Sequence, residues 1–165
     1  MSKTEKAHAD RVWEVIDNAG VCMLATHFSD GLRARPMEAK PDRKGDAIWF
    51  LTDRRGLKDD EVERCPEVCL TFTYPDEKVY LSLTGEASVC RDTGKARDLW
   101  SRKQEAWWDG PDDPNLLVMR IALRRAEMWD GPADSAIAAY EFAKARIFDE
   151  KPDLGENRKI TLDLL

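Results

Sequence analysis

Apolar and polar residues alternate along much of the chain, a pattern typical of strands that are buried on one face. In the segment 79–90, positions 79, 81 and 83 are apolar, while positions 80, 82, 84 and 86 are tyrosine, serine, threonine and glutamate. Gly85 lies within this segment, so a bulge or a close backbone approach is expected there. Similar alternation, or a short apolar run, predicts further strands at 21–26, 32–40, 47–52, 67–74 and 116–125, the last continuing towards 129.

Helical spacing is found in fewer segments. Over 5–18, Val12, Val15 and Ile16 recur on one face, and Gly20 provides a stop signal. Further helices are predicted at 57–64, 92–103 and 135–147, and the tail from 148 on is expected to be loosely packed apart from its last apolar residues. Because most strands follow one another through tight turns, we predict an antiparallel sheet closed into a barrel, with helices at its rim.

Length and charge narrow the class of protein. The 165 residues suit one domain spanning 1–165. The 26 basic and 32 acidic residues give a net charge of −6, which argues against the broad basic surface of a nucleic-acid-binding protein. No apolar run is long enough to span a bilayer, and the polar N-terminus lacks the apolar region of a signal peptide. We therefore expect a cytoplasmic protein that binds neither nucleic acid nor membrane.

Residues that bind metals are few and unsuitably spaced. The cysteines at 22, 65, 69 and 90 form no CxxC pair and there are two histidines, so no metal site is predicted and the cysteines are interpreted as reduced and buried. Asp109, Asp112 and Asp113 lack EF-hand spacing, so we interpret this acidic loop as solvated. The chain also lacks a P-loop, a GxGxxG motif and a serine-histidine-aspartate signature.

Two basic segments are the candidates for chemistry. Arg33 and Arg35 point to the same face of their predicted strand, where two cations repel unless an anion or a carboxylate lies between them. Pro36 cannot donate to the sheet ladder, which leaves backbone groups free for a ligand. By itself, such a basic segment in a chain with 26 lysines and arginines is usually solvated.

The second basic segment runs from Thr52 to Lys58. Here a strand ends, a turn containing Gly56 follows and a helix begins, so that unpaired N–H groups, the Thr52 hydroxyl and the Lys58 ammonium could together hold a phosphate. Neighbouring strands of a meander lie side by side, so the strands at 32–40 and 47–52 are expected to bring Arg35 near Thr52.

Both segments belong to a longer series of motifs: Arg35-Pro-Met37, Trp49-Phe-Leu-Thr52, Lys58, Thr84-Gly-Glu86, Leu99-Trp100, Trp107 to Pro114 and Ala126 to Asp130. In order and spacing this series resembles the FMN-binding split-barrel family related to pyridoxamine 5′-phosphate oxidase, in particular its general stress protein branch. The match covers roughly residues 8–132, where the barrel core is expected, with a helix and tail at 133–165. The resemblance implies a mainly β, six-stranded antiparallel split barrel with peripheral helices.

The resemblance also implies an FMN site. The residues implied at the phosphate are Arg35, Lys58 and the Thr52 hydroxyl, assisted by Arg33, with backbone groups from Gly56 and Leu57. The backbone of Pro36 and Met37 would run along the isoalloxazine ring, and Leu51 would line the neighbouring strand. Trp129 would approach the flavin from the partner subunit, because the family places its flavins at the interface of a homodimer.

In a flavoprotein the cofactor performs the redox step, so no catalytic side chain is named. The resemblance implies an FMN-dependent oxidoreductase acting on a small molecule, or a flavin reductase that uses a nicotinamide donor. Pyridoxamine 5′-phosphate oxidase activity itself is not expected. That branch of the family has a basic segment after its late tryptophan, which helps to bind the substrate phosphate, whereas here Trp129 is followed by Asp-Gly-Pro and no arginine occurs between Trp129 and Arg146. The alternatives are a stress protein that binds FMN or a deazaflavin without turnover, and a ligand-free barrel that serves only as an interaction dimer.

Overall fold

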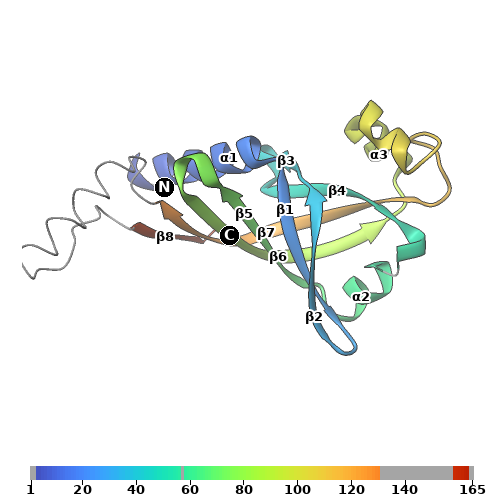
Figure 1. The fold of residues 1–165 in the computed structure, drawn as a ribbon, viewed down its shortest axis with the longest axis horizontal. Coiled ribbons are helices and arrows are strands. Elements are labelled where there is room, and N and C mark those ends of the chain that lie inside the picture. Colours follow the sequence, from blue (N-terminus) through green and yellow to red (C-terminus); the bar gives the residue numbers. More distant parts are fainter. Residues whose placement is uncertain (1–2, 57, 131–157, 164–165) are drawn as a thin grey trace, which may run out of the picture.

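The structure is a computed structural model that describes residues 3–56, 58–130 and 158–163 (Figure 1). Within these residues eight strands form one antiparallel sheet in the order β2-β1-β5-β6-β7-β4-β3, and β8 pairs with β7 outside this path. The strands are β1 (Val21–Phe28), β2 (Gly31–Glu38), β3 (Lys40–Asp42), β4 (Ala47–Asp53), β5 (Glu67–Tyr74), β6 (Val79–Cys90), β7 (Leu116–Asp130) and β8 (Arg158–Asp163). The prediction of a mainly β, antiparallel fold with peripheral helices is confirmed.

Two of these strands go beyond the six that were predicted. The prediction merged β2 and β3 with the intervening residue, but the Ala39 N–H donates to the carbonyl of Gly20 at 2.8 Å, and this contact separates them. The short β3 then pairs with β4. Strand β7 pairs with β6 along one edge. Along its other edge β7 pairs with β4 only as far as Ala122, so the part from Arg125 to Asp130 is available to β8.

Three α-helices are described: α1 (Lys3–Ala19), α2 (Lys58–Arg64) and α3 (Thr93–Leu99). The predicted helix at 92–103 is too long, because Trp100 is extended and a separate 3-10 turn, η4 (Arg102–Ala106), follows it. The predicted helix at 135–147 lies outside the described residues. None of the described helices is long and apolar enough to cross a membrane.

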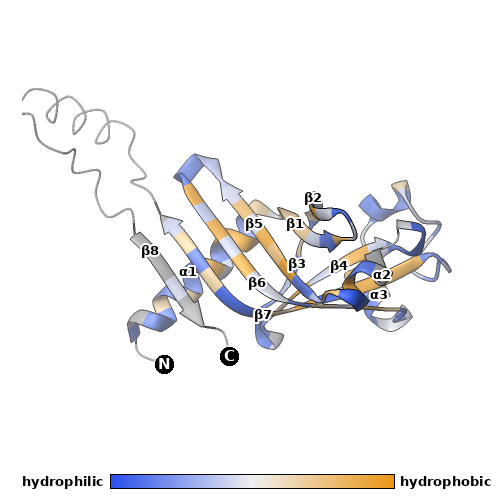
Figure 2. Ribbon diagram, turned by 90° about the horizontal axis from the view of Figure 1, so that it is seen from below, coloured by the Kyte–Doolittle hydropathy of each residue, from blue (hydrophilic) through white to orange (hydrophobic). Residues whose placement is uncertain are grey.

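The core lies between one face of the sheet and the apolar face of α1. Val12, Val15 and Ile16 of α1 are buried against strand residues such as Phe50 and Leu83, as the helical spacing predicted. Figure 2 shows the apolar residues running along β5 and β6. A second, smaller cluster joins α3 to the start of β7 and contains Ala96, Trp108, Leu116 and Val118. This second cluster fixes the position of the loop that follows α3.

Gly85 is the site of a backbone irregularity, as its place within a strand predicted. The pairing between β6 and β7 shifts its register between Thr84 and Gly85. A Cβ atom at Gly85 would lie 2.3 Å from the carbonyl oxygen of Ala122, so a side chain cannot be accommodated without movement of the backbone.

All four cysteines are free thiols in the structure, and their burial differs. Cys22 is buried, and burial raises the pKa of its thiol to about 12. Cys65 and Cys69 are half-buried, while Cys90 is exposed, so the interpretation of all four as buried is wrong. The alternation along β6 ends before Cys90, which explains why the pattern did not place this residue.

Candidate functional site

Strands β2 and β4 meet across a cavity of about 380 Å³ without pairing with each other. The prediction that these two strands lie side by side is therefore wrong. Among the described strands, β2 pairs with β1, while β4 lies between β3 and β7. Because β3 takes the edge of β4, β2 approaches it only across the cavity.

The cavity contains four of the predicted site residues. Pro36 and Met37 line it from β2, and Leu51 and Thr52 line it from β4. Its remaining walls are formed by polar and aromatic residues, namely Glu38, Lys40, Asp53, Arg55, Gln104, Trp107 and Trp108. Asp53 and Arg55 belong to the predicted segment from Thr52 to Lys58, and the Trp-Trp-Asp-Gly sequence after α3 indicates two tryptophans that either cover the cavity or pack the loop. Nothing in the sequence pointed to Glu38, Lys40 or Gln104.

Arg35 directly precedes Pro36 and Met37 on β2, and its side chain lies in a polar environment of its own. One of its guanidinium nitrogens, Nη2, donates to the Thr26 hydroxyl at 2.5 Å and lies 3.5 Å from Oε2 of Glu61 on α2. The guanidinium also stacks over the Phe28 ring, 4.7 Å from its centroid. Its side chain remains 20% exposed.

Arg33 stacks on the same phenylalanine ring as Arg35 but pairs with a different carboxylate. It forms an ion pair with Asp30 at 2.5 Å and stacks on Phe28 with a distance of 4.3 Å to the ring centroid. Each of the two arginines therefore has its own carboxylate, which explains how they share one face of β2. Phe28, Arg33 and Glu61 line a second cavity of about 630 Å³. Arg35 contacts two of these residues, so it lies where β2 passes from one cavity to the next.

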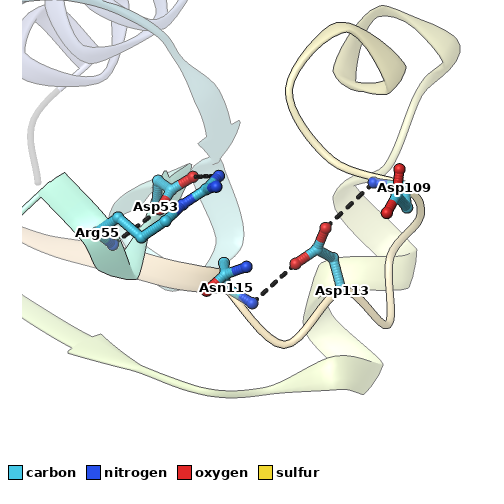
Figure 3. A network of polar contacts seen from close by, with 5 residues as sticks. All are labelled: Asp53, Arg55, Asp109, Asp113 and Asn115. Atoms are coloured by element: carbon cyan, nitrogen blue, oxygen red, sulfur yellow. Dashed lines mark hydrogen bonds and ion pairs between the residues drawn. The ribbon is translucent and has the colours of Figure 1, made fainter.

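The predicted phosphate turn forms the 3-10 turn η2 (Arg54–Gly56), followed by α2 from Lys58. Gly56 is exposed. Leu57 and the side chain of Lys58 lie outside the described residues. The turn is fixed by Asp53, whose carboxylate accepts bonds from the backbone N–H and the guanidinium of Arg55 (Figure 3). These bonds lower the pKa of Asp53 to about 2.

The loop between α3 and β7 forms the opposite wall and is held by its own side chains. Asp113 accepts the backbone N–H groups of Asp109 and Asn115, which lowers the pKa of Asp113 (Figure 3). Asp112 forms an ion pair with Arg97 at 2.6 Å. The acidic loop was interpreted as merely solvated, but two of its three aspartates hold the loop in shape.

Gln104 connects this loop to β2. Its side-chain amide donates to Oε2 of Glu38 at 2.7 Å, and its carbonyl oxygen accepts the N–H and the hydroxyl of Ser101. Gln104 is buried, whereas the Glu38 side chain is partly exposed, so this contact is partly buried. The loop wall therefore keeps a defined position relative to the β2 wall.

The two tryptophans at the end of this wall differ in exposure. Trp107 is 65% exposed, whereas Trp108 is 9% exposed and packs in the cluster with Leu116 and Val118. The indole nitrogen Nε1 of Trp108 is buried and has no hydrogen-bond partner among the described residues. It lies close enough to the Asp53 carboxylate to add slightly to the lowering of that group's pKa, but without the geometry of a hydrogen bond.

Trp129 is far from the cavity of its own chain. It lies near the end of β7, paired with Tyr80 on β6 and Lys159 on β8, while the cavity is near the beginning of β7. Roughly 40 Å of extended strand separates Leu116 from Trp129. Figure 1 shows the corresponding separation of α3 and β8 at opposite ends of the molecule.

Comparison with known proteins shows which family has this architecture. Residues 7–153 match the family model described as "Pyridoxamine 5'-phosphate oxidase like". General stress protein 26 of Bacillus subtilis (strain 168) is 32% identical over 114 residues, which are 67% of this chain and 80% of that protein.

Solved structures agree with this result. A putative general stress protein 26 from Jannaschia sp. CCS1 has a TM-score of 0.71 and 26% identity, over 96% of this chain and 99% of that one. The general stress FMN/FAD binding protein of Xanthomonas citri has a TM-score of 0.67 and 26% identity, over 76% and 89% of the two chains. The chain therefore belongs to the family of pyridoxamine 5′-phosphate oxidase-like proteins, and its resemblance to the general stress protein branch is confirmed.

Proposed function

We propose that the chain binds FMN, with the isoalloxazine ring in the cavity between β2 and β4 and the phosphate at Arg35. The observation that supports this most directly is the position of Arg35 on β2, where it is partly exposed and directly precedes Pro36 and Met37, which line the cavity together with Leu51. A flavin has the same two parts, a planar ring and an anionic tail. The similarity to the FMN/FAD binding protein of Xanthomonas citri supports the same assignment.

The residues present fit such a group. The walls combine apolar and aromatic surfaces with a buried indole N–H that lacks a partner among the described residues, and ring systems with polar edges require both features. Arg35 can form charge-assisted bonds to a phosphate. The turn η2 and the start of α2 follow β4 along the chain. We propose that they complete the phosphate site through Gly56, Leu57 and Lys58.

When bound, FMN would supply the redox chemistry, and the chain would bind and orient it. We propose an oxidoreductase acting on a small molecule, or a flavin reductase with a nicotinamide donor. In this arrangement Asp53 serves as a fixed anion, because its carboxylate is ionised at neutral pH and accepts bonds from the backbone N–H and the guanidinium of Arg55, which lower its pKa to about 2. Asp53 therefore holds the turn in place and does not exchange protons with a substrate.

We further propose that the functional unit is a homodimer. Met23 on β1, Leu32 on β2 and Tyr80 on β6 are at least 41% exposed, and their registers place them on one outer face of the sheet. Trp129 is the cross-strand partner of Tyr80 and shares this face. Large exposed apolar residues on one face favour a protein partner. A second copy covering this face would place Trp129 in the interface.

Light scattering coupled to gel filtration tests the dimer. The wild-type chain is expected at twice its mass of 18.9 kDa. Met23→Asp is expected to shift it towards the monomer, whereas Trp107→Asp, an equally drastic change at an exposed residue off this face, leaves the dimer intact. A wild-type monomer would rule the dimer out.

The flavin is tested by mass spectrometry of the ligand that copurifies with the protein and by titration with added FMN. A protein that carries no flavin and does not bind FMN refutes the proposal, and a copurified deazaflavin would correct the cofactor. Anaerobic addition of NADH or NADPH to the FMN-loaded protein is expected to bleach the flavin absorbance. Binding without bleaching by either donor would favour a flavin-binding protein over a flavin reductase.

A further inference from the structure

The Trp108 side chain has a donor that the fold itself does not use. Its indole nitrogen is buried and lacks a hydrogen-bond partner among the described residues, although the indole lines the cavity between β2 and β4. A buried donor without an acceptor is unfavourable, and native proteins rarely retain one without a reason. The indole nitrogen lies near the carboxylate of Asp53, which also lines the cavity. The unused N–H is therefore found beside a residue of the cavity wall.

The surrounding structure holds this indole firmly in place. Its ring packs against Ala96, Leu116 and Val118 in the smaller core cluster. The backbone N–H of Trp108 donates to the carbonyl of Gln104 at 3.1 Å, and the Gln104 side chain is bonded to Glu38 on the opposite wall. The donor is thus preorganised, so a ligand that accepts its hydrogen bond would lose little energy in ordering the side chain.

We propose that Trp108 is a specificity-determining residue whose Nε1–H donates a hydrogen bond to a carbonyl oxygen on the pyrimidine edge of the bound flavin. This inference rests on the flavin proposal above. The contacts of the two wall carboxylates support a carbonyl acceptor from the ligand. Asp53 accepts bonds from Arg55, and Glu38 accepts a bond from Gln104 and pairs with Lys40, so both carboxylates already have donors of their own. A neutral ligand oxygen that enters the cavity would meet an available neutral donor.

Trp100 provides a matched control, because it packs against the same smaller cluster as Trp108 but is not among the described residues that line the cavity. The experiment measures the dissociation constants of FMN, 2-thio-FMN and 4-thio-FMN by calorimetry for the wild type, Trp108→Phe and Trp100→Phe. Phenylalanine keeps a six-membered aromatic ring but removes the pyrrole ring with its N–H donor, and sulfur in place of oxygen weakens the acceptor. Thermal unfolding of each variant checks that the fold is retained.

Trp108→Phe is expected to weaken FMN binding about fivefold to tenfold, the loss of roughly one net hydrogen bond, while Trp100→Phe changes it less than about twofold. One of the two thio analogues should bind more weakly than FMN to the wild type, but not to Trp108→Phe, because the two changes remove the same bond. This coupling also identifies which carbonyl is contacted.

A spectroscopic measurement on the wild type keeps the test independent of the variants' stability. In protein labelled with ¹⁵N-tryptophan, the Trp108 indole proton, identified by its proximity to the Trp107 ring, is expected to shift downfield when FMN binds. If the wild type binds FMN but this resonance stays in place and the variants bind equally well, the role of Trp108 is refuted and the flavin site stands. If the wild type binds no flavin, both proposals are refuted.

Discussion

The pairing of Arg35 with Glu61 allows a sharp test of where a phosphate binds. The Arg35 guanidinium lies 3.5 Å from the Glu61 carboxylate, and the two side chains are 20% and 11% exposed. An anion that binds Arg35 must therefore approach a carboxylate of the same sign. Two substitutions separate these effects: Arg35→Ala removes the cation, and Glu61→Gln removes the competing charge but keeps the size of the side chain.

The expected magnitudes follow from these contacts. A hydrogen bond to a charged group contributes about 1.5–3 kcal/mol, so Arg35→Ala should weaken FMN binding roughly 10- to 150-fold. Glu61→Gln should have the opposite sign. Because the ion pair is partly exposed, it is worth up to about 1 kcal/mol, and FMN binding should improve by about twofold to fivefold.

Riboflavin, which lacks the phosphate, is the matched ligand for this experiment. Calorimetric titration with FMN and riboflavin at fixed ionic strength should show that both variants change riboflavin affinity less than about twofold. Arg33→Ala is the control variant: Arg33 is already paired with Asp30 and its side chain is 56% exposed, so its loss should affect FMN less than that of Arg35. Equal losses of FMN and riboflavin in Arg35→Ala, or unchanged FMN affinity in Glu61→Gln, would show that the phosphate lies elsewhere.

Two further predictions concern the scaffold. Gly85→Ala places a Cβ atom 2.3 Å from the Ala122 carbonyl oxygen, so it should lower the free energy of unfolding, measured by urea titration, by about 1–3 kcal/mol. At Gly110 an added Cβ atom meets nothing within 4 Å, so the control Gly110→Ala should change this free energy by less than about 0.5 kcal/mol. The pKa of Asp53 is lowered to about 2 by Arg55, so Asp53 stabilises the fold above its ordinary pKa of about 4, and this contribution is lost as the pH falls towards 2. The difference in unfolding midpoint between the wild type and Asp53→Asn should therefore narrow from pH 6 to pH 3, and a constant difference would contradict this assignment.

The alternation of residues was sufficient to predict most of the fold, because one face of each strand is buried. The apolar positions of β6 do point into the core, and Gly85 does mark the irregularity in that strand. The pattern could not predict β3 as a separate strand or β8, since both depend on contacts with residues far away in the sequence. The hydrogen bond from Ala39 to Gly20 separates β2 from β3, and β8 pairs with an edge of β7 that β4 leaves uncovered.

The candidate site was only partly predictable, for a related reason. Pro36, Met37, Leu51 and Thr52 belong to local motifs, and the structure brings these four residues to one cavity. The cavity exists, however, because β2 and β4 do not pair, and its third wall is set by a contact between Glu38 and Gln104, which are 66 positions apart. No local pattern encodes such a contact. The same contact positions the Trp108 donor relative to β2, so a sequence motif can identify this tryptophan but cannot place its donor relative to the other walls of the cavity.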